Sequence, residues 1–300
     1  MKILILGATG YLGSFLYESL SSLDKYEVFG SSRRESFKTI KADLLDGTQL
    51  NNLLKEEDFD IIINSAGHPS PDFCESRPRK ALELNTLTSI NLIKSLKKIR
   101  KKPFLINIST IYVYGDTESQ NNENDITQPI NYYGFTKLLS ELMINHYYQK
   151  SLSIRLPMLI GNPYHPNDLI MNIYKTLVET KNIKLENIEK RYPLDVLDVV
   201  NLIKSLIKSP IYGQINFFNK QSFTRYQIGI EVQKCLSNLG LKTTVTNDGI
   251  YPDPTKWSQV ARRHKNLYVS SCHEIVNHFA FTSLTKTLES VYLQNFSKRI

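Results

Sequence analysis

The sequence predicts an α/β protein with a doubly wound parallel sheet of the Rossmann type and a smaller C-terminal lobe. Through the first half of its 300 residues, short apolar runs alternate with helical patterns, which is the signature of βα units. The apolar runs are continuous rather than alternating, so both faces of their strands should be covered. A glycine-rich turn separates the first apolar run from the first helical pattern, as expected where a helix packs closely on a strand.

Five apolar runs are expected to form the sheet, and helical stretches with apolar residues at every third and fourth position lie between them. The strands are expected at residues 2–6, 27–30, 61–64, 104–109 and 153–156, and the helices at about 12–22, 81–99 and 133–148.

From Gly161 onward the pattern is less regular. We therefore assign residues 1–160 to the sheet domain and residues 161–189 and 220–300 to the lobe. The strong helical period of residues 194–207 predicts that residues 190–219 return to the sheet domain.

Composition limits the class of protein. Hydrophobic residues make up 41% of the chain and charged residues 22%, as in ordinary globular domains. No apolar run is long enough to cross a membrane, and the run at residues 2–6 is too short for a signal peptide. Cys74, Cys235 and Cys272 form no CxxC pair, so neither a disulfide framework nor a metal site is expected. These features predict a cytoplasmic protein without a membrane partner.

The formal net charge of +8 suits an anionic small molecule, but it is equally compatible with simple solubility. The densest basic run, residues 97–102, follows a predicted helix, where cations oppose the helix dipole favourably. We interpret this run as a solvated helix end, and no nucleic-acid partner is expected.

The first strand ends in a glycine-rich turn that leads into a helix. Glycines at this position permit a tight turn, close approach of the backbone to a diphosphate, and close packing of helix on strand. The helix N-terminus adds N–H donors for an anion. A turn without a ligand is the alternative, but the βα units that follow favour a dinucleotide. The turn contributes the candidate cofactor residues Gly7, Thr9, Gly10, Tyr11, Leu12 and Gly13.

The end of the second strand bears on which nicotinamide cofactor is bound. NAD enzymes usually place an acid there for the ribose 2′-hydroxyl, whereas this chain has Ser31, Ser32, Arg33 and Arg34. Arginine binds phosphate through paired, charge-assisted hydrogen bonds. Ser32 and Arg33 therefore favour NADP(H) over NAD(H), with solvated loop arginines as the alternative.

Tyr133 and Lys137 are the candidate proton-transfer pair. Their spacing places them on one face at the start of a helix, and a nearby ammonium should favour the ionised phenol. Tyr132 is the rival, but five residues from Lys137 it would point about 140° around the helix. The pair by itself would indicate a surface contact. However, the preceding strand ends at Ser109 and Thr110, at the sheet edge where ligands bind, so Thr110 is expected to hold a substrate oxygen.

Several motifs together resemble the extended short-chain dehydrogenase/reductase superfamily over residues 1–220. They are the GATGYLG turn, the Asp43-Leu44 pair, Asn64-Ser65-Ala66-Gly67, Asn85, STIYVYG from Ser109 and YGFTK from Tyr133. The resemblance implies that the sheet domain binds NADP and that the lobe binds the substrate. It also implies that Thr110, Tyr133 and Lys137 are the catalytic set. The further cofactor residues that it implies are Asp43 and Leu44 beside the adenine, Ala66, Gly67, Asn85, Tyr133, and Lys137 at the nicotinamide ribose.

Within this superfamily the chain is most similar to the dTDP-4-dehydrorhamnose reductase branch. Residues 72–78, followed by Ala81 and Asn85, and residues 260–267 resemble the corresponding regions of that branch. Two positions depart from it: His264 stands where proline is usual, and Ile111 where Asp is frequent. Related 4,6-dehydratases follow the threonine with two carboxylates, whereas Ile111 and Tyr112 follow it here, so dehydration is not expected.

The resemblance implies NAD(P)H-dependent reduction of a keto group, at C4, on a nucleotide-linked deoxysugar, with the proton supplied by Tyr133. Arg191, Arg262 and Arg263 are candidates for binding the diphosphate, and a surface charge is the alternative for each. A nucleotide-sugar 4-epimerase and a noncatalytic regulatory subunit that retains the fold are the competing hypotheses. A homodimer through the helices expected near residues 85–99 and 133–148 is also implied.

Overall fold

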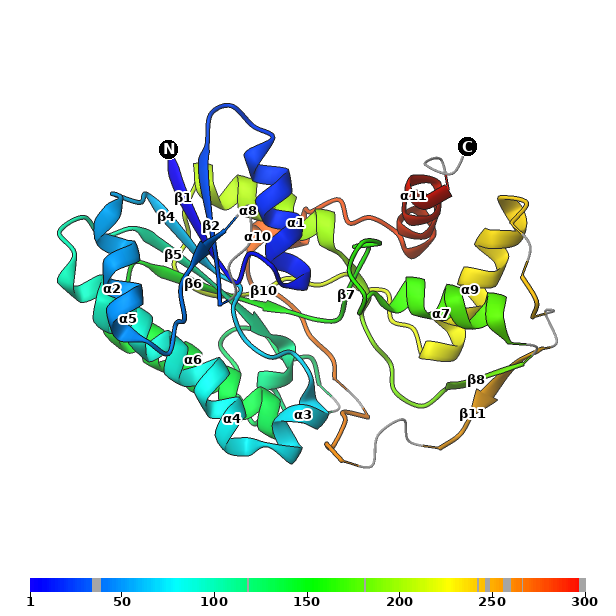
Figure 1. Cartoon of the computed structure of the whole chain (residues 1–300). Helices are drawn as coiled ribbons and strands as arrows, with labels where there is room; N and C mark the ends of the chain where they lie inside the picture. Colours follow the sequence, from blue (N-terminus) through cyan, green and yellow to red (C-terminus); the bar gives the residue numbers. More distant parts are fainter. Residues whose placement is uncertain are drawn as a thin grey trace.

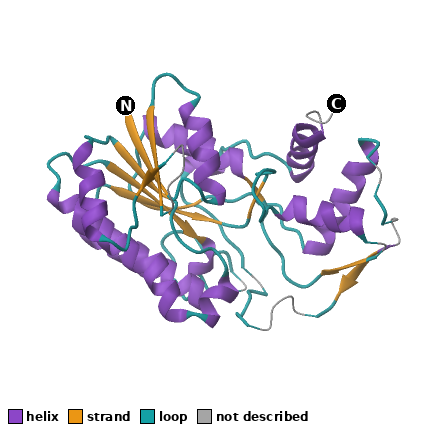
Figure 2. Cartoon of the chain, in the orientation of Figure 1, coloured by secondary structure: helices purple, strands orange, loops and turns teal. Residues whose placement is uncertain are grey.

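The computed structural model describes residues 1–33, 39–117, 119–180, 182–241, 243–245, 249–255, 260–265 and 267–296. Within these residues its centre is a seven-stranded sheet in which every neighbouring pair is parallel (Figures 1 and 2). The order β3-β2-β1-β4-β5-β6-β10 reverses direction between β1 and β4, as in a doubly wound Rossmann sheet. The predicted fold class is therefore confirmed. The strands are β1 (Lys2–Leu6), β2 (Glu27–Ser32), β3 (Ile40–Lys41), β4 (Ile61–Asn64), β5 (Phe104–Thr110), β6 (Ser151–Leu156) and β10 (Gly213–Asn216).

Helices cover both faces of the sheet, because successive strand residues point to opposite sides. Ile3 and Ile5 belong to a core cluster with α1 and α8, whereas Leu4 and Leu6 belong to a cluster with α2, α5 and α6. This double cover explains why the strands are apolar throughout. The helices are α1 (Tyr11–Ser21) and α8 (Val196–Lys208) on one face, and α2 (Gly47–Glu56), α5 (Thr88–Lys98) and α6 (Tyr132–Tyr147) on the other.

The helix expected at residues 81–99 is divided in the structure. Two short helices, α3 (Pro71–Ser76) and α4 (Pro78–Leu82), lead into a π-helical turn at Glu83–Leu87, and α5 follows. The π-helical turn brings Asn85 and Thr86 against α6, where each side chain bonds to Thr136 at 3.0 and 2.8 Å. These two bonds explain why the helix widens here into a π-helical turn. Hydrophobic periodicity alone does not predict this widening.

The smaller lobe lies beside the sheet domain (Figure 1). It has its own hydrophobic cluster, distinct from the clusters of the sheet. Two of its strands, β8 and β11, pair in parallel, and its helices pack beside them. None of the described helices is long and apolar enough to cross a membrane. The elements of the lobe are α7 (Leu169–Glu179), β8 (Ile183–Glu186), α9 (Arg225–Asn238), β11 (Ile250–Asp253) and α11 (Leu284–Phe296).

The chain passes between the two parts more than once. It leaves the sheet at β7 (Leu159–Ile160) and returns at β9 (Leu194–Asp195), and these two short strands pair with each other. The returning segment supplies α8 and the edge strand β10. Later residues also pack on the sheet domain: Val276 of α10 (Glu274–Asn277) lies in the core cluster of β1, and Val269 packs near the 3-10 turn at Ile111–Val113.

Candidate active site

The glycine-rich turn joins β1 to α1 and lies on the loop that follows β4. Gly7 has a φ of +78°, a conformation that favours glycine, and a Cβ added there would lie 2.9 Å from the Ala66 Cα. A Cβ added at Gly13 would lie 2.1 Å from the Gly7 carbonyl oxygen. No described side chain caps the N-terminus of α1, so its first N–H groups are available to an anion.

A groove crosses the carboxyl ends of β1, β2 and β4 beside this turn. Nine of the predicted cofactor residues line it: Gly7, Thr9, Gly10, Ser32, Arg33, Asp43, Leu44, Ala66 and Gly67. Sequence reasoning missed six further lining residues, four of which adjoin the predicted ones at the same strand ends. The six are Ser31, Ala42, Ser65, His68, Leu84 and Thr88.

The polar groups of the groove fit a dinucleotide. The Ser31 hydroxyl is buried without a hydrogen-bond partner among the described residues, which suits a cofactor hydroxyl. The Ser32 hydroxyl shares a hydrogen bond with the Thr39 hydroxyl at 3.0 Å. Arg33 lies exposed at the rim of the groove, whereas Arg34 is outside the described residues. Among the described residues at this strand end, Arg33 is therefore the cation that can contact a 2′-phosphate.

Tyr11, Leu12 and Gly13 support the turn instead of lining the groove. The Tyr11 hydroxyl donates to Asp168 Oδ2 at 2.6 Å and accepts from the Asn162 amide at 3.1 Å. Burial, followed by the Asp168 charge, raises the pKa of Tyr11. Tyr11 thus fastens the glycine-rich turn to the first loop of the lobe, while Leu12 lies in the sheet core.

Thr110 and Tyr133 meet where β5 ends and α6 begins. The Thr110 hydroxyl accepts from the Tyr112 amide at 3.2 Å and forms a hydrogen bond with the Tyr133 phenol. Asn131 caps α6 by accepting from the Gly134 amide at 2.9 Å. A Cβ added at Gly134 would lie 2.1 Å from the Tyr112 carbonyl oxygen, so this glycine lets α6 approach the β5 end closely enough for the two hydroxyls to meet.

Lys137 does not act on Tyr133 as expected. Its Nζ donates to the Ile108 carbonyl at 2.6 Å. Burial raises the pKa of Tyr133, the hydrogen bond with Thr110 opposes this rise, and Lys137 is not among the described groups that shift it. The expectation that Lys137 makes the Tyr133 phenol acidic is therefore wrong. Burial has the largest effect on the pKa of Tyr133, so the phenol stays protonated at neutral pH.

The ammonium of Lys137 is the group of this set that titrates nearest to neutral pH. Burial lowers the pKa of Lys137 to about 8, and the Glu141 carboxylate partly offsets this fall. Below that pH Lys137 is charged, and above it the charge is lost.

We expect turnover to be constant below pH about 8 and to fall above it, as Lys137 loses its proton. The measurement is the initial rate of NADPH oxidation between pH 6 and pH 10. Lys137→Arg stays charged across this range, so its residual activity should lack the fall. If the turnover of the unmodified protein stays constant up to pH ~9.5, Lys137 is not the group whose titration limits turnover.

Asn85 holds the β4 loop against α6. Its Oδ1 accepts from the His68 amide at 2.7 Å, and its Nδ2 donates to Thr136 Oγ1 at 3.0 Å and to the His68 carbonyl at 3.3 Å. The Cys74 thiol donates to the same carbonyl at 3.8 Å and lies close enough to influence the pKa of both Tyr133 and Lys137. The groove and the Tyr133 site are therefore joined through Asn85 and Cys74.

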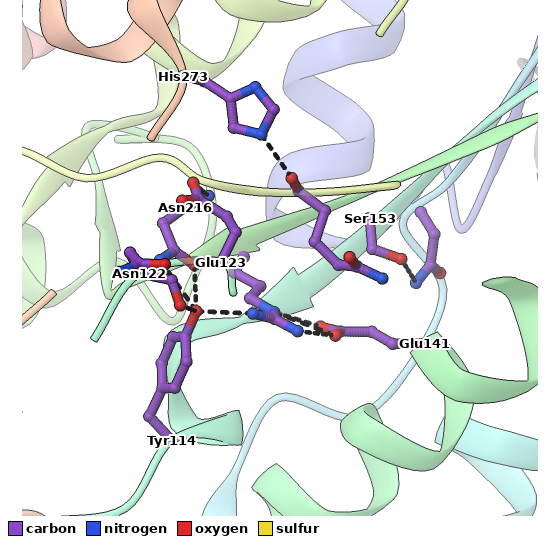
Figure 3. A network of polar contacts seen from close by, with 10 residues as sticks. Tyr114, Asn122, Glu123, Glu141, Ser153, Asn216 and His273 are labelled. Carbon is purple, nitrogen blue, oxygen red and sulfur yellow. Dashed lines mark hydrogen bonds and ion pairs between the residues drawn. The ribbon is translucent and has the colours of Figure 1, made fainter. Parts of the chain in front are cut away.

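A buried ion pair involves Glu141, one helical turn beyond Lys137 on α6; Figure 3 shows Glu141 and Tyr114 in the network around it. Arg155 of β6 binds Glu141 through Nε and Nη2, at 3.0 and 2.7 Å from Oε2. Its Nη1 donates to the Tyr114 hydroxyl at 2.6 Å, and Tyr114 in turn donates to the Asn122 carbonyl at 2.8 Å. Arg155 and Glu141 are 4% and 1% exposed, so this pair has few other partners for its charges.

Of the three arginines expected at the substrate, Arg191 and Arg263 lie near Glu189, whereas Arg262 lies near Asp116. Arg191 is held by Glu186, at 2.7 Å, and by Glu189. Arg262 is 67% exposed and 3.6 Å from Asp116. Arg263 binds Asp72 at 2.9 Å, and its Nη1 is buried without a hydrogen-bond partner among the described residues.

Arg225 joins Arg191 and Arg263 around Glu189, and sequence reasoning missed it. Burial and the neighbouring Arg191 lower the pKa of Arg225 to about 10. Glu189 accepts from the Tyr112 hydroxyl at 3.4 Å, and the rings of Tyr112 and Tyr133 are 6.2 Å apart. This cluster therefore extends from the lobe to the edge of the Thr110–Tyr133 site. No local motif marks Arg225, because only the fold brings α9 beside residues 186–191.

His264 and the cysteines have structural roles. His264 Nε2 bonds to the Tyr114 carbonyl at 2.9 Å, and its ring packs on Tyr112. The three cysteines are free. Among the described residues, Glu123, Cys272 and His273 form one group with the spacing of metal ligands. Glu123 already accepts four hydrogen bonds, two of them from Cys272, and His273 bonds to the Gln214 carbonyl (Figure 3). These hydrogen bonds indicate that the three side chains hold the surrounding loops in place.

The sequence matches the RmlD substrate binding domain family over residues 1–283. The chain belongs to this family. The expected membership of the extended short-chain dehydrogenase/reductase superfamily is thereby confirmed. The structure of this RmlD family protein is similar to dTDP-4-dehydrorhamnose reductase from Bacillus anthracis in complex with NADP, with a TM-score of 0.84, 22% identity and coverage of 98% of this chain and 99% of that one.

Two other relatives of this RmlD family protein differ from that reductase. UDP-glucuronic acid 4-epimerase from Bacillus cereus, in complex with UDP-glucuronic acid and NAD, has a TM-score of 0.80 and 20% identity, and covers 100% of this chain and 99% of its own. In sequence, methionine adenosyltransferase 2 subunit beta from Rattus norvegicus is 28% identical over 238 residues, which cover 77% of this chain and 71% of the relative.

Proposed function

We propose that the protein is an NAD(P)H-dependent reductase of a nucleotide-linked 4-keto sugar, acting in the cytoplasm in the synthesis of surface polysaccharides or deoxysugars. The observation that carries the proposal is the hydrogen-bonded Thr110 and Tyr133 pair at the carboxyl end of β5, joined through Asn85 to a groove suited to a dinucleotide. The family match and the NADP-bound reductase of similar fold support it.

The residues divide the reaction between them. The groove would hold a nicotinamide dinucleotide, which would supply the hydride for the carbonyl carbon. Thr110 hydrogen-bonds the carbonyl oxygen, and this bond strengthens as negative charge develops there. Tyr133 donates its proton to the same oxygen, and its raised pKa keeps that proton in place until it is needed. Lys137, whose ammonium donates to the Ile108 carbonyl of β5, would hold the nicotinamide ribose.

Arg225 and Arg263 replace Arg191 in the proposal as the anchors of the substrate diphosphate. Arg191 is neutralised by two glutamates, whereas Arg263 keeps a buried Nη1 without a hydrogen-bond partner among the described residues. Both guanidinium groups act on Glu189, which bonds to Tyr112 beside Tyr133. A diphosphate at this cluster would place the attached sugar toward the Tyr133 hydroxyl.

The direct test is a set of nucleotide-linked 4-keto sugars, each assayed for oxidation of NADPH and of NADH. Reduction of at least one of them supports the proposal. A nucleotide-sugar 4-epimerase would instead carry tightly bound NAD through purification and convert sugars without net cofactor oxidation.

A noncatalytic regulatory subunit is the second candidate, because the β subunits of methionine adenosyltransferase are among the relatives of this chain. Retention of a methionine adenosyltransferase on the immobilised protein, together with absent turnover on the whole set of sugars, would favour it.

The homodimer belongs to the proposal as well: α6 leaves Leu142 and Tyr147 exposed, and light scattering measures the assembly.

Replacing Arg33 by Ala should weaken NADPH binding about 10-fold and leave NADH binding nearly unchanged, because a charged hydrogen bond to the 2′-phosphate is lost. Dissociation constants follow from the change in dihydronicotinamide fluorescence on binding. Arg100→Ala, which removes an exposed arginine outside the groove, is the matched control. An equal loss for both cofactors would exclude a 2′-phosphate contact at Arg33.

A further inference from the structure

We infer that His68 is a cofactor-binding residue whose Nε2–H donates a hydrogen bond to the diphosphate of the dinucleotide. The inference rests on the proposed function. His68 lines the groove with Gly10 of the α1 N-terminus and Arg33 of the β2 end. It follows directly on Ala66 and Gly67, which the family resemblance implies as cofactor residues and which also line the groove.

His68 is held in place by a stacking contact of its ring and by hydrogen bonds of its backbone. Its ring stacks on Phe73, with centroids 3.7 Å apart and planes inclined by 15°. Its backbone amide donates to Asn85 Oδ1 at 2.7 Å, and its carbonyl accepts from Asn85 Nδ2 at 3.3 Å. The guanidinium of Arg77 lies over the Phe73 ring at 5.1 Å. A side chain fixed in this way loses little conformational entropy when it binds a ligand.

The hydrogen bonds also determine which ring nitrogen carries the proton. The Ser70 amide donates to His68 Nδ1 at 3.4 Å, and a backbone N–H cannot accept, so Nδ1 is the unprotonated nitrogen. In the neutral ring the proton therefore resides on Nε2. His68 then presents a donor, the kind of group that a phosphate oxygen requires.

The electrostatic setting of His68 agrees with this role. Burial lowers the pKa of His68, and the Arg33 and Arg77 charges lower it further, so the ring is neutral at pH 7. These two guanidinium groups are the charges among the described residues that act on it. The diphosphate charge opposes both, so binding of the cofactor should favour the protonated imidazole. Cofactor affinity should therefore rise as the pH falls through the range in which the bound imidazole takes up a proton.

The experiment compares His68→Phe with His68→Gln. Phe keeps the stack on Phe73 but has no donor, so NADPH and ADP-ribose should bind about 10-fold more weakly. Gln has a side-chain N–H donor and should restore binding to within about 3-fold of the unmodified protein. His146→Phe, an exposed histidine on α6, is the control, and thermal unfolding of each variant checks that the fold is retained.

The outcomes separate this inference from the proposed function. If the unmodified protein binds neither NADPH nor NADH, both are overturned. If it binds NADPH and His68→Phe binds equally well, only the role of His68 is overturned. An equal loss of affinity for 2′,5′-ADP, which lacks the diphosphate, would also overturn the assignment. Loss of the affinity gain at low pH in His68→Phe would support it, because a purely structural role would leave that pH dependence intact.

Discussion

Replacing Tyr133 by Phe is expected to lower turnover at least ~100-fold while NADPH binding stays unchanged. The substitution keeps the ring and its packing against Tyr112 but removes the hydroxyl that meets Thr110. Among the described residues, no other tyrosine both packs against Tyr112 and meets Thr110. The loss corresponds to about 2.7 kcal/mol of transition-state stabilisation, a typical contribution of one positioned proton donor.

Kinetics and binding together test this expectation. The measurement is kcat for reduction of a 4-keto sugar nucleotide, with the dissociation constant of NADPH determined in parallel. Tyr132→Phe is the matched control, because it alters the neighbouring phenol, which packs on Phe135 instead. Normal kcat in Tyr133→Phe would refute the assignment, whereas loss of NADPH binding would show that the residue shapes the cofactor site.

Replacing Arg155 by Met is expected to lower the free energy of unfolding by about 3–5 kcal/mol. The change leaves Glu141 buried without its bidentate partner and removes the donor to the Tyr114 hydroxyl. Isolated carboxylates are costly inside a protein because nothing replaces their hydration. The shift of the urea unfolding midpoint measures the effect.

A double variant separates the ion pair from the packing. Arg155→Met with Glu141→Leu should recover most of the lost stability, since no unpaired charge remains. Lys234→Ala breaks the exposed pair with Glu231 and should cost less than about 1 kcal/mol. If Arg155→Met is as mild as this control, the buried pair does not stabilise the fold.

The double variant should also change the pH profile. Glu141 raises the pKa of Lys137 against the effect of burial. Without that carboxylate, the pKa of Lys137 falls further below about 8, so the fall in turnover should begin at lower pH. An unchanged profile would show that Glu141 and Lys137 are not coupled.

The sheet and most of the groove could be predicted from the sequence because local patterns specify them. Continuous apolar runs mark strands covered on both faces, and the residues that follow each run lie at one edge of a parallel sheet. This pattern predicted Gly10 as a groove residue, and the family resemblance predicted Asp43 and Ala66; all three line the groove. His68, two residues beyond Ala66, lies at the same strand end.

The contacts of individual side chains could not be predicted in the same way. Lys137 donates to a backbone carbonyl on β5, and sequence spacing carries no information about such a partner. Tyr11 bonds to a residue 157 positions away. Arg191 is different, because Glu186 and Glu189 stand five and two residues before it in the sequence, and these nearby acids are a signal that it forms an internal ion pair.

The bond between Tyr11 and Asp168 has a consequence for engineering chimeric proteins. A fragment that ended near residue 160 would lose the partner of the Tyr11 hydroxyl, together with α8 and β10, which complete one face and one edge of the sheet. Exchange of the smaller lobe between relatives therefore requires at least three junctions, near β7, near β9 and after β10. The segment that carries α8 must stay with the dinucleotide half, and Asp168 must come with any transplanted lobe.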